Sequence, residues 1–255
     1  MKHFIKKFTF TICILLLSYS FLCSESYLGT KAPEDPKNIG DIVFNDGSST
    51  PYSENLNLPS EQKNAAVAFI FYVGTDCSDD GENRTLGIGL KSGQKFFKWC
   101  DKKASANFEW IDTIYETTKN GSQNFEKIGK WLKEHGKKDD TGDEKKYPAF
   151  HYAKKFGEQT KNIGIFNNGW YIPSKEEIRI AYEQYSTINA VCKLCNLPEF
   201  DGIFWTSSQG NHKDDWAGQI AWVHRFYDEE GDKFYGLFDE ASKTVPYHIC
   251  VIREF

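Results

Sequence analysis

The chain has 255 residues, of which 40% are hydrophobic and 26% charged, so it can bury an ordinary core and wholesale disorder is excluded. Its formal net charge is −5 and no Lys/Arg stripe gathers along it, which argues against nucleic acid as a partner. Aromatic residues make up 16% of the chain; we expect most to fill the core and the excess to serve recognition.

Residues 1–22 have the pattern of a secretion signal. Lys2, Lys6 and Lys7 precede an apolar stretch from Phe8 to Leu17, and small and polar residues follow. The apolar stretch is too short to predict a membrane span. We therefore predict a signal peptide and an exported protein.

Cys23 stands where a bacterial lipoprotein carries its lipid. The preceding Leu22 is larger than the Gly, Ala or Ser usual in a lipobox. Two alternatives stay open: lipidation of Cys23, which gives a cell-surface lipoprotein of the outer membrane, or ordinary cleavage near Ser26, which gives a secreted or periplasmic protein. A lipid anchor is the one membrane contact that the sequence predicts.

The polar residues 23–37, with two prolines, predict a tether, and the folded domain is predicted to span 38–255. Local patterns then predict a strand at 39–44, a short helix at 62–66 capped by Ser60, and strands at 67–73 and 85–90.

Three helices are predicted next: 125–134 capped by Asn124, 147–156, and one that begins after Ser174 and continues through Tyr185. The third start is the clearest, because Ser174-Lys-Glu-Glu177 is a capping box. Strand patterns follow at 204–207, 221–226, 233–238 and 248–253. Helices followed by a run of strands predict an α+β domain.

No pattern predicts catalysis, a metal site or a cofactor. The carboxylates lie in turns and charged runs, the histidines lack ligand spacing, and no nucleophile elbow or phosphate loop occurs. The cysteines after Cys23 are Cys77, Cys100, Cys192, Cys195 and Cys250. In an oxidising compartment we expect disulfides among them with one thiol left over, and Cys77 and Cys100 could close a loop.

The C-terminal part is rich in aromatic and acidic residues. In the strand 221–226, the two-residue period places Trp222, His224 and Phe226 on one face, and Val223 and Arg225 on the other. Large side chains on both faces fit either a sheet covered on both sides or an exposed recognition face. The interleaved acids favour exposure.

Several motifs occur in a fixed order: Gly169-Trp-Tyr-Ile-Pro-Ser-Lys-Glu-Glu177, Phe204-Trp-Thr-Ser-Ser-Gln209, Ala221-Trp222 and Cys250-Val-Ile-Arg-Glu-Phe255. Together they resemble bacterial domains with the C-type-lectin-like fold of the formylglycine-generating-enzyme type. More closely, the chain is similar to the variable proteins of the treponemal type, which are targets of diversity-generating retroelements. The resemblance covers roughly 38–255 and implies a variable ligand-display region at about 204–255.

In that family, adenine-directed copying diversifies residues that bind ligands, and it cannot produce Trp, Lys, Glu, Gln or Met. The resemblance therefore implies that Trp222, Glu229, Glu230, Lys233, Glu240 and Lys243 are fixed. The implied ligand-binding residues, with preference for those that face outward, are His212, Val223, Arg225, Tyr227, Asp228, Asp232, Phe234, Tyr235, Leu237, Asp239, Tyr247 and His248. The buried side of the sheet is expected to hold Trp205, Phe226, Cys250 and Ile252.

Two departures from the family pattern weaken the implied diversification. Glu229 and Glu230 lengthen a hairpin, and His224 and Phe238 stand where Leu or Val and Lys are expected. We expect a monomeric, non-enzymatic receptor or adhesin-like protein that binds a protein or another macromolecule. The alternatives are a fixed-sequence structural lipoprotein of the envelope and, less favoured, an enzyme of the formylglycine-generating type.

Overall fold

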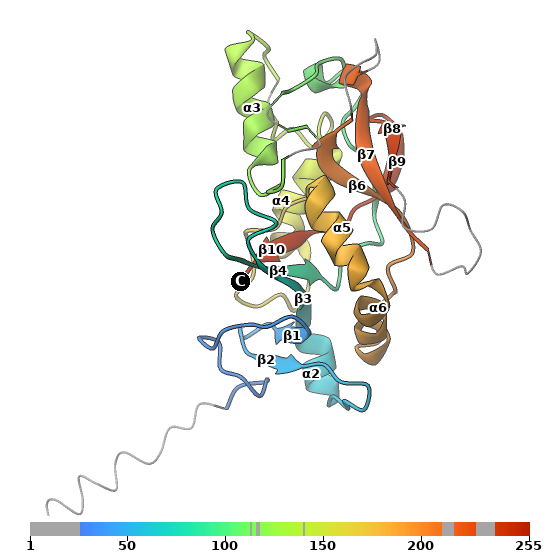
Figure 1. Cartoon of the computed structure of the whole chain (residues 1–255). Helices are drawn as coiled ribbons and strands as arrows, with labels where there is room; N and C mark the ends of the chain where they lie inside the picture. The colour runs from blue at the N-terminus through green and yellow to red at the C-terminus, as the bar shows by residue number, and fades with distance from the viewer. Residues whose placement is uncertain (1–25, 113, 116–117, 140, 211–216, 228–237) are drawn as a thin grey trace, which may run out of the picture.

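The regular structure of the described chain consists mainly of two five-stranded sheets and four longer helices (Figure 1). The computed structural model describes residues 26–255 except 113, 116–117, 140, 211–216 and 228–237. The predicted α+β class is confirmed at this level.

The first sheet is antiparallel, with the strand order β10-β4-β3-β1-β2. Its strands are β1 Asp41–Phe44, β2 Ser49–Pro51, β3 Ala66–Gly74, β4 Arg84–Gly89 and β10 Ile252–Glu254, and the short helix α2 Ser60–Ala65 precedes β3. The last strand of the chain, β10, thus forms one edge of the sheet that contains the first strand, β1.

The second sheet has the order β5-β9-β6-β7-β8, in which β6 and β9 are parallel and the other pairs antiparallel. Its strands are β5 Phe96–Lys98, β6 Gly202–Gln209, β7 Ile220–Phe226, β8 Phe238–Ser242 and β9 Pro246–His248. The predicted strand at 248–253 is therefore wrong as a single element, because its ends belong to different sheets. Of the pattern at 233–238, residues 233–237 lie outside the described residues.

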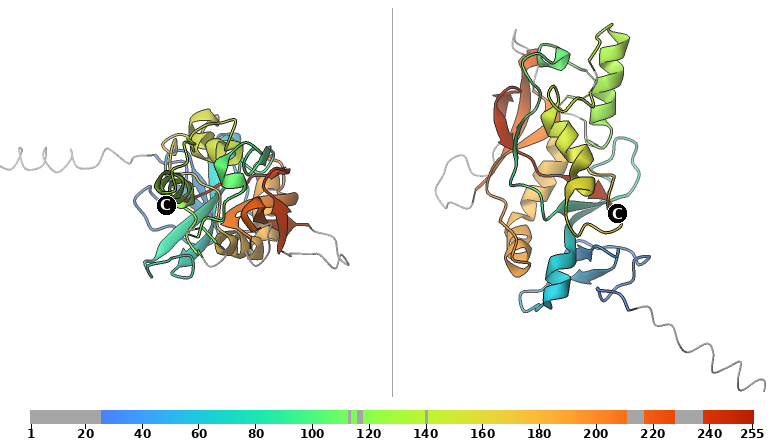
Figure 2. Two further views of the ribbon diagram at one scale, coloured as in Figure 1. Left: turned by 90° about the horizontal axis from the view of Figure 1, so that it is seen from above. Right: turned by 180° about the vertical axis from the view of Figure 1, so that it is seen from behind.

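Helices α5 Lys175–Glu183 and α6 Tyr185–Leu194 lie on one side of the molecule, and α4 Pro148–Gln159 lies on the other (Figures 1 and 2). Helix α3 Asn124–Glu134 stands at the far end from β1 and β2. The capping box is confirmed, since Ser174 Oγ accepts from the Glu177 amide and Glu177 accepts from the Ser174 amide. Tyr185 begins a new helix, because the backbone of Gln184 leaves the helical region.

Two predicted caps are wrong. Ser60 is the first residue of α2 and its side chain caps nothing, while Pro59 occupies the cap position. Asn124 likewise lies inside α3, and its side-chain amide donates to Ser207 Oγ at 2.7 Å. A tertiary partner for the Asn124 amide has replaced the local bond that the sequence predicts.

The core consists of two hydrophobic clusters. One contains Trp99, Trp205 and Phe150, and the other contains Phe226, Cys250 and Ile252. All four residues expected on one buried side of the sheet are fully buried, but Trp205 lies in a different cluster from the other three. The single buried side expected from the sequence is therefore wrong, because the chain packs apolar side chains on both sides.

The expected disulfides are absent: the five cysteines from Cys77 to Cys250 are buried free thiols. Cys77 and Cys100 lie in different clusters, so the loop between them is not closed by a bridge. Burial raises the pKa of Cys100, Cys192 and Cys250 to about 12, which keeps these thiols neutral.

Part of the predicted tether lies against the domain. The Gly29 amide donates to Ser48 Oγ at 2.7 Å, and the Lys31 ammonium pairs with buried Asp41 at 2.6 Å. Lys31 also forms an isolated β-bridge with Ser49. Within the described residues, no helix is long and apolar enough to cross a bilayer.

Candidate functional site

The register of the second sheet gathers several predicted binding residues on one face. Val223 of β7 is opposite Trp205 of β6 and Asp239 of β8, and opposed residues of a sheet project to the same face. Arg225 lies two residues along β7 and therefore shares this face. We call it the open face and define it by Phe97, Ile203, Trp205, Val223, Arg225, Asp239 and Tyr247.

Tyr247 joins the open face from β9. It is opposite Phe97 of β5, and its ring meets the Trp205 ring edge-on, with 5.1 Å between centroids. Phe97 in turn contacts Tyr152 of α4 at 5.0 Å. Helix α4 thus borders the open face on the β5 side and leaves the rings of Phe97 and Tyr247 only partly buried.

Arg225 and Asp239 supply the charges of the open face. Arg225 Nη2 lies 2.8 Å from Asp239 Oδ2, and the two side chains are 26% and 55% exposed. At such exposure the ion pair contributes little to the free energy of unfolding, so either side chain can be replaced at small cost to the fold.

Val223 is a correction to the predicted site. Its side chain is only 2% exposed and belongs to the same buried cluster as Trp205. This burial keeps a ligand from Val223. The sequence prediction failed because the two-residue period shows which face a side chain lies on, but not how deeply it is buried. Val223 therefore supports the open face from below.

The opposite face of the same strands, which we call the covered face, packs against α5 and α6. Phe226 contacts the rings of Tyr182 and Tyr185 at 5.2 and 5.5 Å, and the Lys175 ammonium lies 3.4 Å from the centroid of Trp222. His224 is 1% exposed, and burial lowers its pKa to about 4. The predicted division of β7 into two faces is confirmed.

His224 and Phe238, the two residues that depart from the family pattern, are cross-strand partners. Their rings meet edge-on at 4.5 Å, with an interplanar angle of 88°. The neutral imidazole therefore fills an aromatic cluster together with the Phe238 ring.

Of the remaining predicted residues, His248 lies on the covered side of the second sheet, and most of the others lie outside the described residues. His248 is opposite Phe204 and stacks on it at 5.1 Å, while its Nδ1 lies 2.7 Å from the Gly93 carbonyl oxygen. Tyr227 is half-buried just after β7. His212, Asp228, Asp232, Phe234, Tyr235, Leu237 and Cys23 lie outside the described residues, as do Glu229, Glu230 and Lys233.

Lys243, expected to be fixed, has a role that the sequence does not reveal. Its side chain is fully buried, and Nζ donates to the carbonyl oxygens of Ala106 and Gly218, both at 2.7 Å. Burial lowers the pKa of this ammonium to about 7. Lys243 thereby ties the segment before α3 to the turn that leads into β7.

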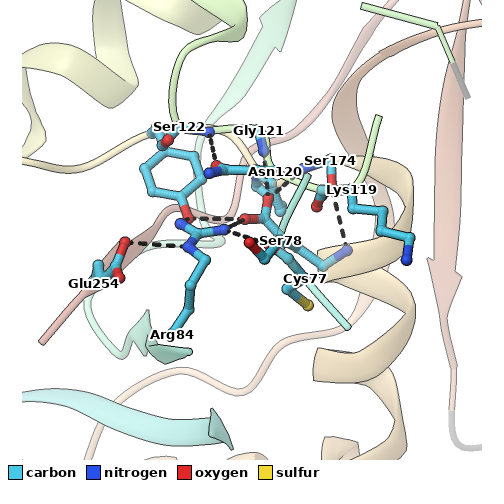
Figure 3. Close-up of polar contacts among 12 residues, drawn as sticks. Cys77, Ser78, Arg84, Lys119, Asn120, Gly121, Ser122, Ser174 and Glu254 are labelled. Carbon is cyan, nitrogen blue, oxygen red and sulfur yellow. Dashed lines mark hydrogen bonds and ion pairs between the residues drawn. The ribbon is translucent and has the colours of Figure 1, made fainter. Parts of the chain in front are cut away.

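A buried polar cluster joins β4 of the first sheet to helix α5 (Figure 3). Glu177 of α5 is fully buried and accepts hydrogen bonds from Arg84 Nη1 at 2.8 Å and from the Tyr171 hydroxyl at 2.9 Å. It also accepts from the backbone amides of Gly121 and Ser174. Burial raises the pKa of the Glu177 carboxyl, and the adjacent Arg84 guanidinium opposes that rise. The sequence shows the capping box but not this long-range partner.

No group of His, Cys, Asp and Glu suited to a metal ion occurs in the part of the chain that the structure describes. No family model matches the chain, and no curated protein matches its sequence.

Proposed function

We propose that this is an exported, non-enzymatic binding protein with a C-type-lectin-like fold, at the cell surface or secreted, whose open face binds a protein or another macromolecule. The observation that carries this proposal is the convergence of Arg225, Asp239 and Tyr247 from three strands onto one partly exposed face. Aromatic rings supply contact area at small entropic cost, and the charged pair supplies orientation.

The packing of distant motifs supports the proposed fold. Tyr171 of the first motif and Ile252 of the last form a β-bridge, with both backbone hydrogen bonds at 3.0 Å. The Arg253 guanidinium lies 5.9 Å from the Trp170 centroid, and Trp170 meets Phe255 edge-on. The first and last of the motifs on which the family resemblance rests therefore pack against each other.

The proposal includes diversification of the open face by a retroelement. The test is to sequence the codons of residues 220–248 in many passaged clones. We expect substitutions at Arg225, Asp239 and Tyr247, with Trp222 and Lys243 unchanged. Val223 serves as the internal control, because the substitution rule permits it to change but its burial does not tolerate polar residues.

Two outcomes would contradict this part of the proposal. An invariant segment would favour the alternative of a fixed-sequence envelope protein. Substitutions spread equally over Val223 and Arg225 would mean that the open face does not determine what is selected.

The burial of the late cysteines disfavours the enzyme alternative. Cys192, Cys195 and Cys250 are at most 5% exposed, and burial raises the pKa of each thiol to about 11 or 12. A cysteine pair that reacts needs an accessible thiolate. We therefore propose no catalytic role for these three cysteines.

A further inference from the structure

A cleft lies between α3, α4 and residues 169–172, and none of its lining residues belongs to the open face. Its volume is about 270 Å³. Pockets for drug-sized ligands usually measure roughly 300–1,000 Å³, so this cleft suits a smaller molecule.

The floor of the cleft is apolar and rigid. Phe150, Ala153, Trp170 and Ile172 are each at most 4% exposed. Trp170 is held in place because its Nε1 donates to the Phe166 carbonyl oxygen at 2.7 Å. The Phe125 ring stacks on Phe150, with 5.6 Å between centroids and a 20° interplanar angle. Phe125 is only partly buried, so its ring is the one that the cleft offers to a flat apolar group.

The back wall is fixed by the buried polar cluster. The Gly121 amide and the Tyr171 hydroxyl, which belong to two lining residues, both donate to Glu177 (Figure 3). A Cβ atom added at Gly121 would lie 2.6 Å from the Ser174 nitrogen, so this loop has no room to shift inward. The cleft is thus largely preformed, which reduces the cost of binding.

Opposite charges flank the mouth. Glu126 projects from α3 and Lys154 from α4, and both residues are exposed lining residues. The Lys154 ammonium lies 5.5 Å from the centroid of the Phe125 ring. Neither Glu126 nor Lys154 has an ion-pair partner among the described residues. A cation and an anion therefore stand over an aromatic floor, each open to a ligand.

We propose that this cleft binds one free amino acid with an aromatic side chain. The ring packs against Phe125 over the apolar floor, the α-carboxylate meets Lys154 and the α-ammonium meets Glu126. A zwitterion with an apolar ring matches both charges and the apolar floor. This site is independent of the open face and of the macromolecular ligand proposed for it.

Titration calorimetry of the mature protein with L-phenylalanine tests the proposal. We expect saturable binding, weakened about fivefold by Lys154→Gln or by Glu126→Gln, as for a partly exposed charge contact. The matched control is Lys130→Gln, which removes an exposed lysine of α3 that does not line this cleft. This control should bind as the wild type does.

Two truncated ligands separate the roles of the charges. Phenethylamine lacks the carboxylate, so Lys154→Gln should not weaken its binding, whereas Glu126→Gln should. Phenylpropionate lacks the ammonium and should show the reverse pattern. Ala153→Leu fills the floor and should abolish binding of all three compounds while the protein stays folded in near-ultraviolet circular dichroism.

The proposal is overturned if L-phenylalanine does not bind saturably, or if both charge variants bind it with wild-type affinity. Because Glu126 and Lys154 are exposed, these variants test the site even if Ala153→Leu fails to fold.

Discussion

The two faces of the second sheet differ in what holds their side chains. On the covered face, Phe226 and His224 lie beneath α5 and α6 and contact several rings each. On the open face, Arg225 and Asp239 form a partly exposed ion pair, whereas Trp205 and Val223 of the same face are buried. The outer positions of the open face are thus less constrained by packing than the covered face, so under the proposed function they can change their chemistry while the fold persists.

The largest expected effect comes from breaking the covered face. Phe226→Ala should lower the free energy of unfolding by about 3–5 kcal/mol, because it removes a fully buried ring from between Tyr182 and Phe204. The adjacent Arg225→Ala should change it by about 0.5 kcal/mol or less. Urea unfolding of both variants measures the difference. Equal losses would mean that the two faces do not differ as described.

His224 should make the covered face sensitive to acid. The unfolded chain takes up a proton at this residue below about pH 6.5, whereas the folded chain does so only near pH 4, so stability falls as the pH drops through this window. The gap corresponds to about 3 kcal/mol, fully lost below pH 4.

His224→Phe should remove this contribution, and urea unfolding between pH 4 and 7 measures it. The charge of nearby Arg179 also lowers the His224 pKa, so Arg179→Gln should reduce the acid sensitivity in part. If wild type and His224→Phe lose stability in parallel, His224 is not the source.

The sequence predicts what local patterns determine. The two-residue period of β7 and the capping box at Ser174 each depend on residues within one element, and both are confirmed. The fate of residues 246–254 depends on pairing with strands far away in the chain, so the sequence could not show that β9 and β10 join different sheets.

The sequence also could not predict the burial of charged side chains. Lys243 and Arg84 look like surface residues, yet backbone carbonyls or a carboxylate satisfy them inside the protein. For Val223 the prediction failed in the opposite way, because a side chain expected to be exposed is buried. His224 and Phe238 looked like two separate departures, and only the register shows that they are one pair.

A smaller effect is expected at the edge of the covered face. Lys175→Met should lower the free energy of unfolding by about 1 kcal/mol, because the ammonium lies over the Trp222 ring and within 5.1 Å of Phe238. Lys130→Met, at a residue whose side chain is 78% exposed, is the matched control and should be nearly neutral. Thermal unfolding of the two variants compares them. If the two variants unfold at the same temperature, the Lys175 ammonium does not stabilise the fold through the Trp222 ring.

The smallest effect should come from the open face itself. Arg225 and Asp239 are paired at 2.8 Å but exposed, so a double-mutant cycle of Arg225→Ala and Asp239→Ala should give a coupling free energy of about 0.2–1 kcal/mol, reduced at high salt. A coupling above about 2 kcal/mol would mean that the pair supports the fold. Selection could not then exchange these residues freely, and the open face would be a structural surface. A weak coupling leaves both side chains available to a ligand, which is the property that a diversified binding face requires.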